Sequence, residues 1–187
     1  MKKNLLNKSA RELALIAAFV SLIIVGALVS IPVFPVAFTL QTLFVLTAGA
    51  VLGGVEGAIC VLVYIFMGLI GLPVFAGGGS GFSYALKPSF GFTIGFAAAA
   101  LVVGLIVDKD PRVSSKRLIF ALSLGSAIIY VCGIAYYLLL QTLYFSASVD
   151  IWYVLLYFWI IFIPSDVLKG VVAFFAVKKV LPIIYRK

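Results

Sequence analysis

The 187-residue sequence contains no histidine and only two cysteines, Cys60 and Cys132, each inside an apolar run. Histidine is a frequent metal ligand and general base, and thiols in apolar sequence are typical of buried side chains rather than of a disulfide. We find no serine or cysteine nucleophile with a partner base, and no Gly-x-x-x-x-Gly-Lys-Ser/Thr phosphate loop. The sequence therefore predicts a protein without catalytic residues, metal or cofactor that does not hydrolyse ATP itself.

Charged residues are also scarce: they make up 11% of the chain, whereas hydrophobic residues make up 65%. Soluble domains usually contain about 25% charged and about 45–50% apolar residues, so a water-soluble fold could not bury this much apolar surface. The 14 basic residues outnumber the 6 acidic ones, but they flank apolar runs, which is typical of membrane-protein loops. We expect one domain over residues 1–187 that lies in the lipid bilayer and binds no nucleic acid.

Six apolar runs approach the length of about 20 residues that a helix needs to cross a bilayer. Between the second and third runs, residues 52–57 are rich in glycine, which permits a tight turn. The predicted fold class is an all-α integral membrane protein built as a bundle of six transmembrane helices. The runs cover residues 13–30, 38–53, 55–72, 89–107, 118–145 and 151–177.

The basic residues predict the orientation of these six helices. If the N-terminus is cytoplasmic, twelve of the fourteen basic residues fall on the cytoplasmic side, only Lys87 lies in an outer connection, and Lys169 lies within the last run. Cytoplasmic loops carry an excess of Lys and Arg, so both termini are expected in the cytoplasm. The twelve are Lys2, Lys3, Lys8, Arg11, Lys109, Arg112, Lys116, Arg117, Lys178, Lys179, Arg186 and Lys187.

Asp166 and Lys169 are the charged residues nearest the middle of an apolar run. Each costs roughly 2.5–3.5 kcal/mol to insert at the bilayer centre, and their spacing of three places them on one helix face. Pro164, which has no N–H, is expected to open the helix locally just before them. Two interpretations remain open at this point: a structural ion pair that neutralises itself, or a polar clamp in which both side chains bind a ligand.

Two stretches on the outer side contain further candidates. Gly77, Gly78 and Gly79 form either a flexible linker or a lid whose backbone approaches a ligand closely, with Phe75 and Tyr84 supplying apolar faces. Such lids close over many ligand sites.

Three polar residues on the same side have two interpretations each. Lys87 could meet an anionic group or simply lie at the membrane interface. Thr39 and Gln41 could bind a ligand, or they could cap the second helix and bond a neighbouring one.

Small residues recur along the first run, where Ala14 and Ala18 have the small-xxx-small spacing. This spacing permits close contact between helices in lipid, either within the bundle or with another membrane subunit.

Four segments, taken in order, strongly resemble the BioY family, the biotin-specific substrate-binding (S) components of energy-coupling factor (ECF) transporters. The resemblance extends over essentially the whole chain. The segments are Thr-Leu-Gln-Thr-Leu-Phe-Val-Leu at 39–46, Gly-Leu-Pro-Val-Phe-Ala-Gly-Gly at 71–78, Lys-Pro-Ser-Phe-Gly-Phe at 87–92 and Pro-Ser-Asp-Val-Leu-Lys at 164–169.

The resemblance implies a six-helix protein of the bacterial plasma membrane that binds biotin from outside with high affinity. It implies assembly with a transmembrane coupling subunit, contacted through Ala14 and Ala18, and with two cytoplasmic ATPase subunits. It also implies that the outer loops after the first and third helices act as lids. In such a site, Phe75, Tyr84 and Phe90 could wall the biotin ring.

The sequence leaves open how biotin would be oriented and whether the protein has a different function. Asp166 could accept a ureido N–H while Lys169 donates to the ureido oxygen, or Lys169 could instead bind the carboxylate of the biotin tail. One alternative function is a self-sufficient secondary transporter with Asp166 as a proton site. A third hypothesis is a membrane enzyme that uses Asp166 and Lys169 as acid and base.

Overall fold

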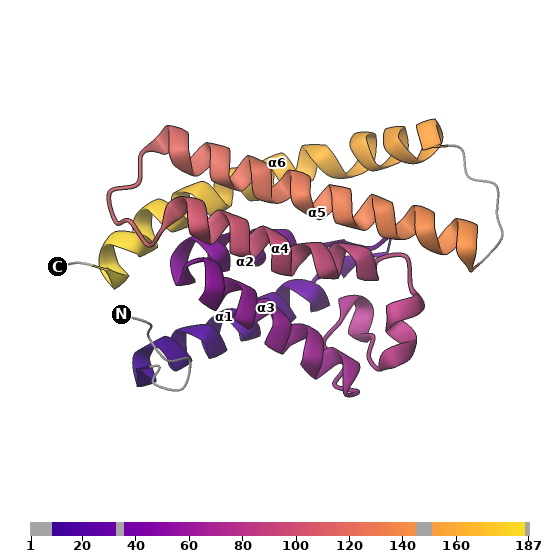
Figure 1. Ribbon diagram of the computed structural model, residues 1–187, viewed down its shortest axis with the longest axis horizontal. Coiled ribbons are helices and arrows are strands. Elements are labelled where there is room, and N and C mark those ends of the chain that lie inside the picture. The colour runs from indigo at the N-terminus through magenta and orange to yellow at the C-terminus, as the bar shows by residue number, and fades with distance from the viewer. Residues whose placement is uncertain (1–8, 33–35, 145–150, 186–187) are drawn as a thin grey trace.

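The computed structural model describes residues 9–32, 36–144 and 151–185; within the last range it leaves the side chains of residues 151, 153, 155 and 157–161 undescribed. Most of the described chain is helical, and Figure 1 shows how the helices lie. The elements are α1 (Ala10–Leu28), β1 (Ser30–Ile31), β2 (Phe38–Thr39), α2 (Gln41–Leu52), α3 (Gly54–Leu69), the short 3-10 turns η1 (Ala76–Gly78) and η2 (Phe82–Leu86), α4 (Phe90–Val107), α5 (Ser115–Leu143) and α6 (Ile151–Ile184).

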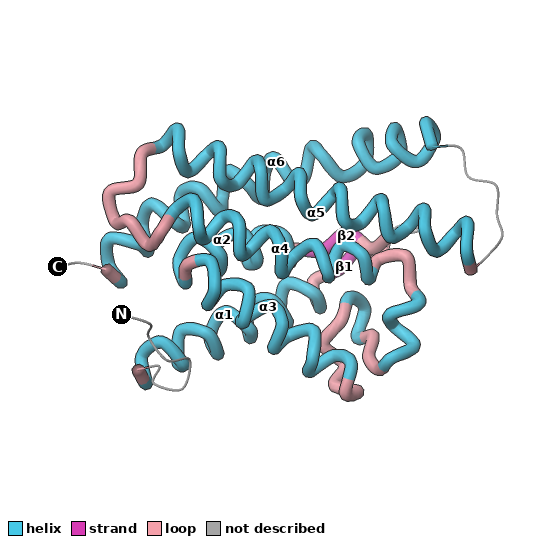
Figure 2. Tube along the Cα trace, in the orientation of Figure 1, coloured by secondary structure: helices cyan, strands magenta, loops and turns pink. Residues whose placement is uncertain are grey.

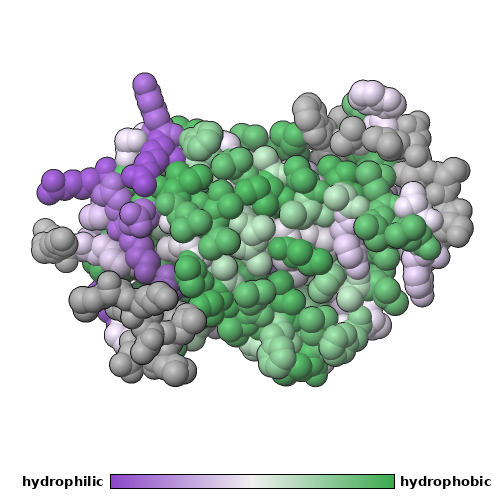
Figure 3. Space-filling model, in the orientation of Figure 1, coloured by the Kyte–Doolittle hydropathy of each residue, from purple (hydrophilic) through white to green (hydrophobic). Residues whose placement is uncertain are grey.

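The surface of this bundle is apolar where a soluble protein would be polar. Large apolar side chains such as Phe120, Val131 and Phe175 are mostly exposed, and Figure 3 shows apolar residues over the middle of the visible face with hydrophilic ones gathered at one end. Among the described residues, α1, α4 and α5 are long and apolar enough to cross a membrane, while α2 and α3 are shorter apolar helices. The prediction of a helical membrane protein is confirmed.

The helix α2 forms the centre of the bundle. Ten of its twelve residues are buried, and its apolar side chains pack against α1, α4 and α6. In Figure 1, α1 and α3 lie on one side of it and α5 and α6 on the other, with α4 between. A helix buried on every face must be apolar all round, which explains why the second run shows no polar stripe.

Glycines let α2, α3 and α4 approach one another at backbone distance. A Cβ on Gly49 would meet the Ala100 backbone 2.6 Å away, and one on Gly104 would overlap the backbone of Gly53 and Gly54. Gly53, at the turn between α2 and α3, has φ +87°, a left-handed conformation that favours glycine. Small residues at helix contacts allow this close packing in lipid.

Side-chain contacts tie several helix ends together at one end of the molecule. Arg11 in the first turn of α1 donates a hydrogen bond to the carbonyl of Ile184 in the last turn of α6. Lys109, after α4, pairs with Glu56 at the start of α3 with Nζ and Oε2 3.3 Å apart. The beginning of α1, the connection from α4 to α5 and the end of α6 therefore lie together (Figure 1). Lys2, Lys3, Lys8, Arg186 and Lys187 lie outside the described residues.

Several predicted boundaries were wrong. Phe38 and Thr39 were expected in the second helix, but they form β2, which pairs antiparallel with β1 so that Ser30 lies opposite Thr39 (Figure 2). The chain folds back on itself here, and α2 begins only at Gln41. α6 extends to Ile184 rather than to residue 177.

Pro164 does not end α6, and a local opening of the helix at this proline stays a prediction. α6 continues through this proline, so the loss of one N–H does not divide the helix.

We predict that Gly104→Ala destabilises the bundle, because its methyl group would overlap backbone atoms that cannot rotate away. Overpacking of this kind costs about 1–3 kcal/mol, equivalent to a fall in melting temperature of about 3–10 °C. Gly170→Ala is the matched control, since a Cβ at Gly170 meets nothing within 4 Å and alanine favours the helix. Thermal unfolding in detergent measures both; equal melting temperatures would contradict the close-packing account.

Candidate functional site

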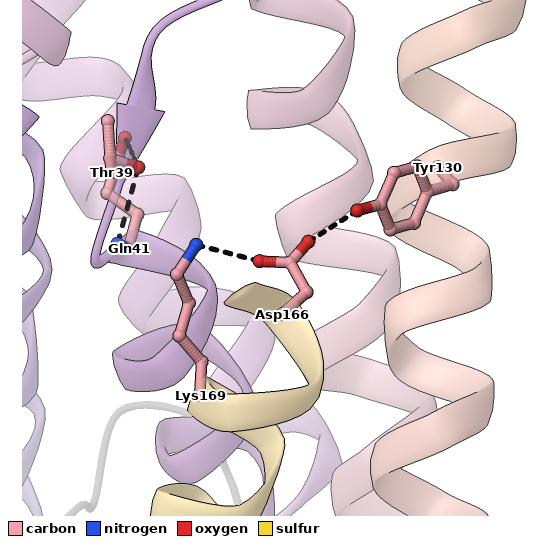
Figure 4. Close-up of polar contacts among 5 residues, drawn as sticks. All are labelled: Thr39, Gln41, Tyr130, Asp166 and Lys169. Atoms are coloured by element: carbon pink, nitrogen blue, oxygen red, sulfur yellow. Dashed lines mark hydrogen bonds and ion pairs between the residues drawn. The ribbon is translucent and has the colours of Figure 1, made fainter. Parts of the chain in front are cut away.

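Asp166 and Lys169 form a buried ion pair near the middle of α6. The Lys169 Nζ lies 2.7 Å from Asp166 Oδ1, and the side chains are only 7% and 13% exposed, respectively. Tyr130, on α5, donates a hydrogen bond of 2.6 Å to the other carboxylate oxygen, Oδ2 (Figure 4). The Lys169 ammonium also lies 4.4 Å from the centre of the Phe38 ring, within cation–π range. The predicted placement of both charges on one helix face is confirmed.

A small cavity of about 50 Å³ borders this pair. Thr39, Gln41 and Tyr84, three of the residues singled out in the sequence, line it together with Asp166 and Lys169. The rest of the lining comes from the segment before α2, from α2 itself, from η1, and from α4, α5 and α6. These further residues are Val36, Ala37, Thr42, Ala76, Ser89, Phe92, Thr93, Phe96, Ile129, Tyr130 and Phe162.

Thr39 and Gln41 make the structural contacts considered for them, and their binding of a ligand stays a prediction. The Thr39 hydroxyl accepts a hydrogen bond from the Gln41 backbone N–H at 3.4 Å, which satisfies a free donor at the start of α2. The Gln41 side-chain NH₂ donates to the Tyr64 hydroxyl at 2.8 Å, which links α2 to α3. The Thr39 hydroxyl also donates to Gln41 Oε1 at 3.2 Å. These bonds fix both side chains at the cavity wall.

An aromatic stack supports the cavity from the segment between α3 and α4. The rings of Phe75 and Tyr84 stack with centroids 4.4 Å apart, and the Phe90 ring meets Phe75 edge-on at 6.2 Å. Only Tyr84 of these three is among the described lining residues; Phe75 and Phe90 lie behind it. Burial raises the pKa of the Tyr84 phenol, so it stays a neutral hydroxyl that can donate or accept.

The glycine run and Lys87 lie farther out. Gly77 and Gly78 are exposed and have φ of +67° and +75°, a left-handed conformation that glycine adopts readily. Lys87 is exposed, with its Nζ 4.7 Å from the Tyr84 ring centre. The described cavity lining includes neither these residues nor Gly79; it includes their neighbour Ala76 instead. Within this run, Gly79 packs against the Tyr84 ring and pairs with Phe75, whereas a Cβ on Gly77 or Gly78 would meet nothing within 4 Å.

Sequence reasoning missed Tyr130, which binds the carboxylate directly, and the lining residues Ser89, Thr93 and Phe162. One signal was available for Tyr130. A tyrosine in the middle of an apolar run buries a hydroxyl, and such hydroxyls usually have a hydrogen-bond partner. Asp166 was a candidate partner, but only the crossing of α5 and α6 brings the two together.

The arrangement suits binding of a small polar ligand rather than covalent chemistry. A carboxylate, an ammonium group and neutral hydroxyl and amide groups meet in one apolar surround, so they offer both donors and acceptors. Pockets for small molecules usually measure about 300–1,000 Å³, whereas 50 Å³ is little more than the share of one or two waters. The site is therefore closed around its own side chains in this conformation.

The model of the BioY family matches residues 1–186. The chain belongs to the BioY family. The resemblance recognised from the four sequence segments is thus confirmed.

Named relatives agree with this membership. The chain is 47% identical over 130 residues to a probable biotin transporter BioY of Lysinibacillus sphaericus, in a match that covers 70% of this chain and 66% of that protein. It is 34% identical over 176 residues to the biotin transporter BioY of Rhizobium etli, covering 88% and 90% of the two chains.

A solved structure resembles this BioY chain over nearly its full length. The crystal structure of an S-component for biotin from an ECF-type ABC transporter superposes with a TM-score of 0.78 at 26% identity. The match covers 96% of this chain and 94% of the other. The overall helical arrangement is therefore similar to that of a known S-component.

We predict that Asp166→Asn and Lys169→Met each destabilise the protein in the absence of ligand, and that the double variant recovers most of the loss. Removing one partner of a buried pair leaves an uncompensated charge, which costs about 3–5 kcal/mol of folding stability. The double variant has two neutral side chains and leaves no unpaired charge. Thermal unfolding in detergent measures all three. Lys109→Met, in a partly exposed pair, is the control and should cost far less. Single variants that melt with the native protein would show that the pair contributes nothing.

Proposed function

We propose that this protein is the biotin-binding S component of an ECF transporter and captures biotin from outside the cell for ATP-driven uptake. One observation carries the proposal: a buried Asp–Lys pair lines a cavity in a chain that matches an S-component for biotin over 96% of its length. The relatives named as biotin transporters support the same ligand. They give no support to a proton-driven carrier or an enzyme.

The site residues match the chemistry of biotin. Its ureido group has two N–H donors and one carbonyl acceptor, so Asp166 accepts a ureido N–H and Lys169 donates to the ureido oxygen. A carboxylate has about four acceptor positions, and two are used by Lys169 and Tyr130, so positions for the ligand remain. Thr39, Gln41 and Tyr84 complete the polar wall. Lys87, exposed beside Tyr84, attracts the carboxylate of the tail.

Binding requires the cavity to open, and two segments are placed to open it. The strand β2 contributes Thr39, and the segment between α3 and α4 contributes Ala76 and Tyr84 to the lining. Both segments connect helices, so they can move while the helices keep their places, although Phe75 and Tyr84 must then leave their core contacts. We therefore assign the lid role to the β1–β2 hairpin and to the segment holding Gly77, Gly78 and Gly79. Phe75 and Phe90 support the ring-facing Tyr84 from behind.

The protein crosses the bacterial plasma membrane six times, as one domain over residues 1–187, with both termini in the cytoplasm. The start of α1, the α4–α5 connection and the end of α6 lie together at one end of the molecule. The described basic residues other than Lys87 and Lys169 gather at this end, which supports the proposed topology. α2 and α3, at 12 and 16 residues, are shorter than a full span, and the adjoining hairpin and turns make up the remaining thickness.

The energy for transport comes from partner subunits. α1 exposes Ala14 and Ala18 on its outer face, so a second helix can approach its backbone closely. We assign this face to the transmembrane coupling subunit, which joins the S component to two cytoplasmic ATPase subunits. The protein itself needs no cofactor, because binding and release involve no covalent step.

We predict that the isolated protein in detergent binds biotin tightly without ATP and prefers it to thiamine and riboflavin. Thiamine has no ureido group, and the pyrimidinedione ring of riboflavin offers one N–H between two carbonyls instead of two N–H donors beside one carbonyl. Calorimetry with the three vitamins measures the preference; tighter binding of thiamine or riboflavin would overturn the proposed ligand.

The Asp166→Asn/Lys169→Met double variant is the sharper arm of this experiment. It should stay folded yet bind biotin at least tenfold more weakly, because each lost charge-assisted bond is worth about 1.5–3 kcal/mol. A folded double variant with native affinity would reduce the pair to a structural ion pair.

We predict that Ala14→Trp and Ala18→Trp leave biotin binding intact but abolish uptake by the assembled transporter, because a bulky ring blocks close helix contact. Leu139→Trp is a matched control, since Leu139 is 54% exposed on α5, away from this face. Uptake of labelled biotin by cells that carry all subunits measures the effect. Normal uptake by both alanine variants would place the docking surface elsewhere.

A further inference from the structure

Among the described residues, α5 packs extensively along α4 and has far less contact with α6, which it crosses in Figure 1. Between α5 and α6 lies a groove of about 1040 Å³, lined mainly by apolar side chains such as Ile134, Leu138 and Phe174. Val131 and Val167 at its margin are 68% and 61% exposed, so the groove opens onto the apolar surface of the bundle.

Tyr130 and Asp166 line both this groove and the small ligand cavity. The hydrogen bond between the Tyr130 hydroxyl and Asp166 Oδ2, 2.6 Å long, therefore lies on the boundary between the two spaces. Figure 4 shows Tyr130 reaching from α5 toward Asp166, on the side away from Lys169. The Tyr130 ring also packs edge-on against Phe92 of α4, with ring centres 6.3 Å apart.

We propose that Tyr130 is a positioning residue of the ligand site: its hydroxyl orients the Asp166 carboxylate, and its ring separates the site from the membrane-facing groove. This inference rests on the proposed function, since it assigns a residue to the same biotin site. Nothing in the sequence segments that resemble the family includes residue 130.

The hydroxyl orients the carboxylate because it holds the oxygen that Lys169 leaves free. The terminal torsion of aspartate is broad, so a carboxylate bound at one oxygen can still rotate. With Oδ1 bound to Lys169 and Oδ2 bound to Tyr130, its plane is fixed and its remaining acceptor positions point in set directions. A ligand N–H then binds a carboxylate that is already fixed, so binding costs less conformational entropy and is stronger.

The ring matters for a separate reason. Charge-assisted hydrogen bonds are strong only where the surroundings keep a low dielectric constant. Tyr130 and Asp166 together line the groove where it meets the small cavity, so removal of the Tyr130 ring would widen the opening from the groove to the pair. Water and mobile lipid chains would then reach the bound ligand, and its dissociation would be faster.

The first experiment is a double-mutant cycle on biotin affinity, measured by calorimetry in detergent. Tyr130→Phe keeps the ring and removes the hydroxyl, so affinity should fall about tenfold, as expected for a lost bond to a charged group. In the Asp166→Asn/Lys169→Met background, the same change should cost less than twofold, because the carboxylate it orients is gone. If that background binds no biotin, the first comparison decides alone.

Tyr185→Phe is the matched control, because its hydroxyl donates to the Val51 carbonyl at 3.0 Å at the other end of the bundle. It should leave affinity unchanged. A purely structural role for Tyr130 would lower the melting temperature without ligand and leave affinity native, and this result would overturn the proposal. An equal loss in both backgrounds of the cycle would overturn it as well.

The second experiment tests the ring through the rate of biotin dissociation. The rate should rise from Tyr130→Phe to Tyr130→Leu to Tyr130→Ala, as less of the boundary remains. If Tyr130→Ala does not fold, the comparison of phenylalanine with leucine makes the same test. Equal rates in the folded variants would overturn the separating role. Failure of the native protein to bind biotin would instead overturn the proposed function, so the two failures are distinct.

Discussion

A charged pair in the middle of an apolar bundle imposes the main constraint on this structure. Because both side chains are largely buried, the charges of Asp166 and Lys169 need partners within the protein. The pair meets this condition with a 2.7 Å ion pair, the Tyr130 hydroxyl and the face of the Phe38 ring. These partners come from α5, α6 and β2, so the hairpin and the two long helices are held in register by one polar centre. The small cavity exists because these elements meet there.

The two halves of the bundle are packed in different ways around that centre. α2, α3 and α4 meet at backbone distance through Gly49, Gly57 and Gly104. A larger residue at these positions would overlap backbone atoms, and no side-chain rotation could relieve the overlap. In the part of the chain that the structure describes, α5 and α6 have far less contact, beside a large groove. Gln41, on the tightly packed half, keeps its position through Tyr64. α5 also meets α4 at backbone distance, at Gly91 and Gly95, and α6 packs along α2. The looser contact is therefore the one between α5 and α6, beside the charged pair.

The sequence predicted the parts of this arrangement that depend on local pattern. Apolar runs gave the helices, and the spacing of Asp166 and Lys169 predicted their contact. β1 and β2 were missed because strands of two residues are too short to show any periodicity. The positions of Phe75 and Phe90 behind Tyr84 depend on how the segment between α3 and α4 folds, which no spacing rule specifies. Tyr130 lies 36 residues from Asp166, and only the crossing of two helices joins them.

The closed cavity has a consequence for how fast and how tightly a ligand is captured. A cavity of about 50 Å³ is too small for biotin, so a ligand can enter only the fraction of the unliganded protein in which the site has opened. The apparent dissociation constant is then the intrinsic one divided by the open fraction, so a tenfold smaller open fraction weakens binding about tenfold. Association waits on opening and stays below the diffusion limit.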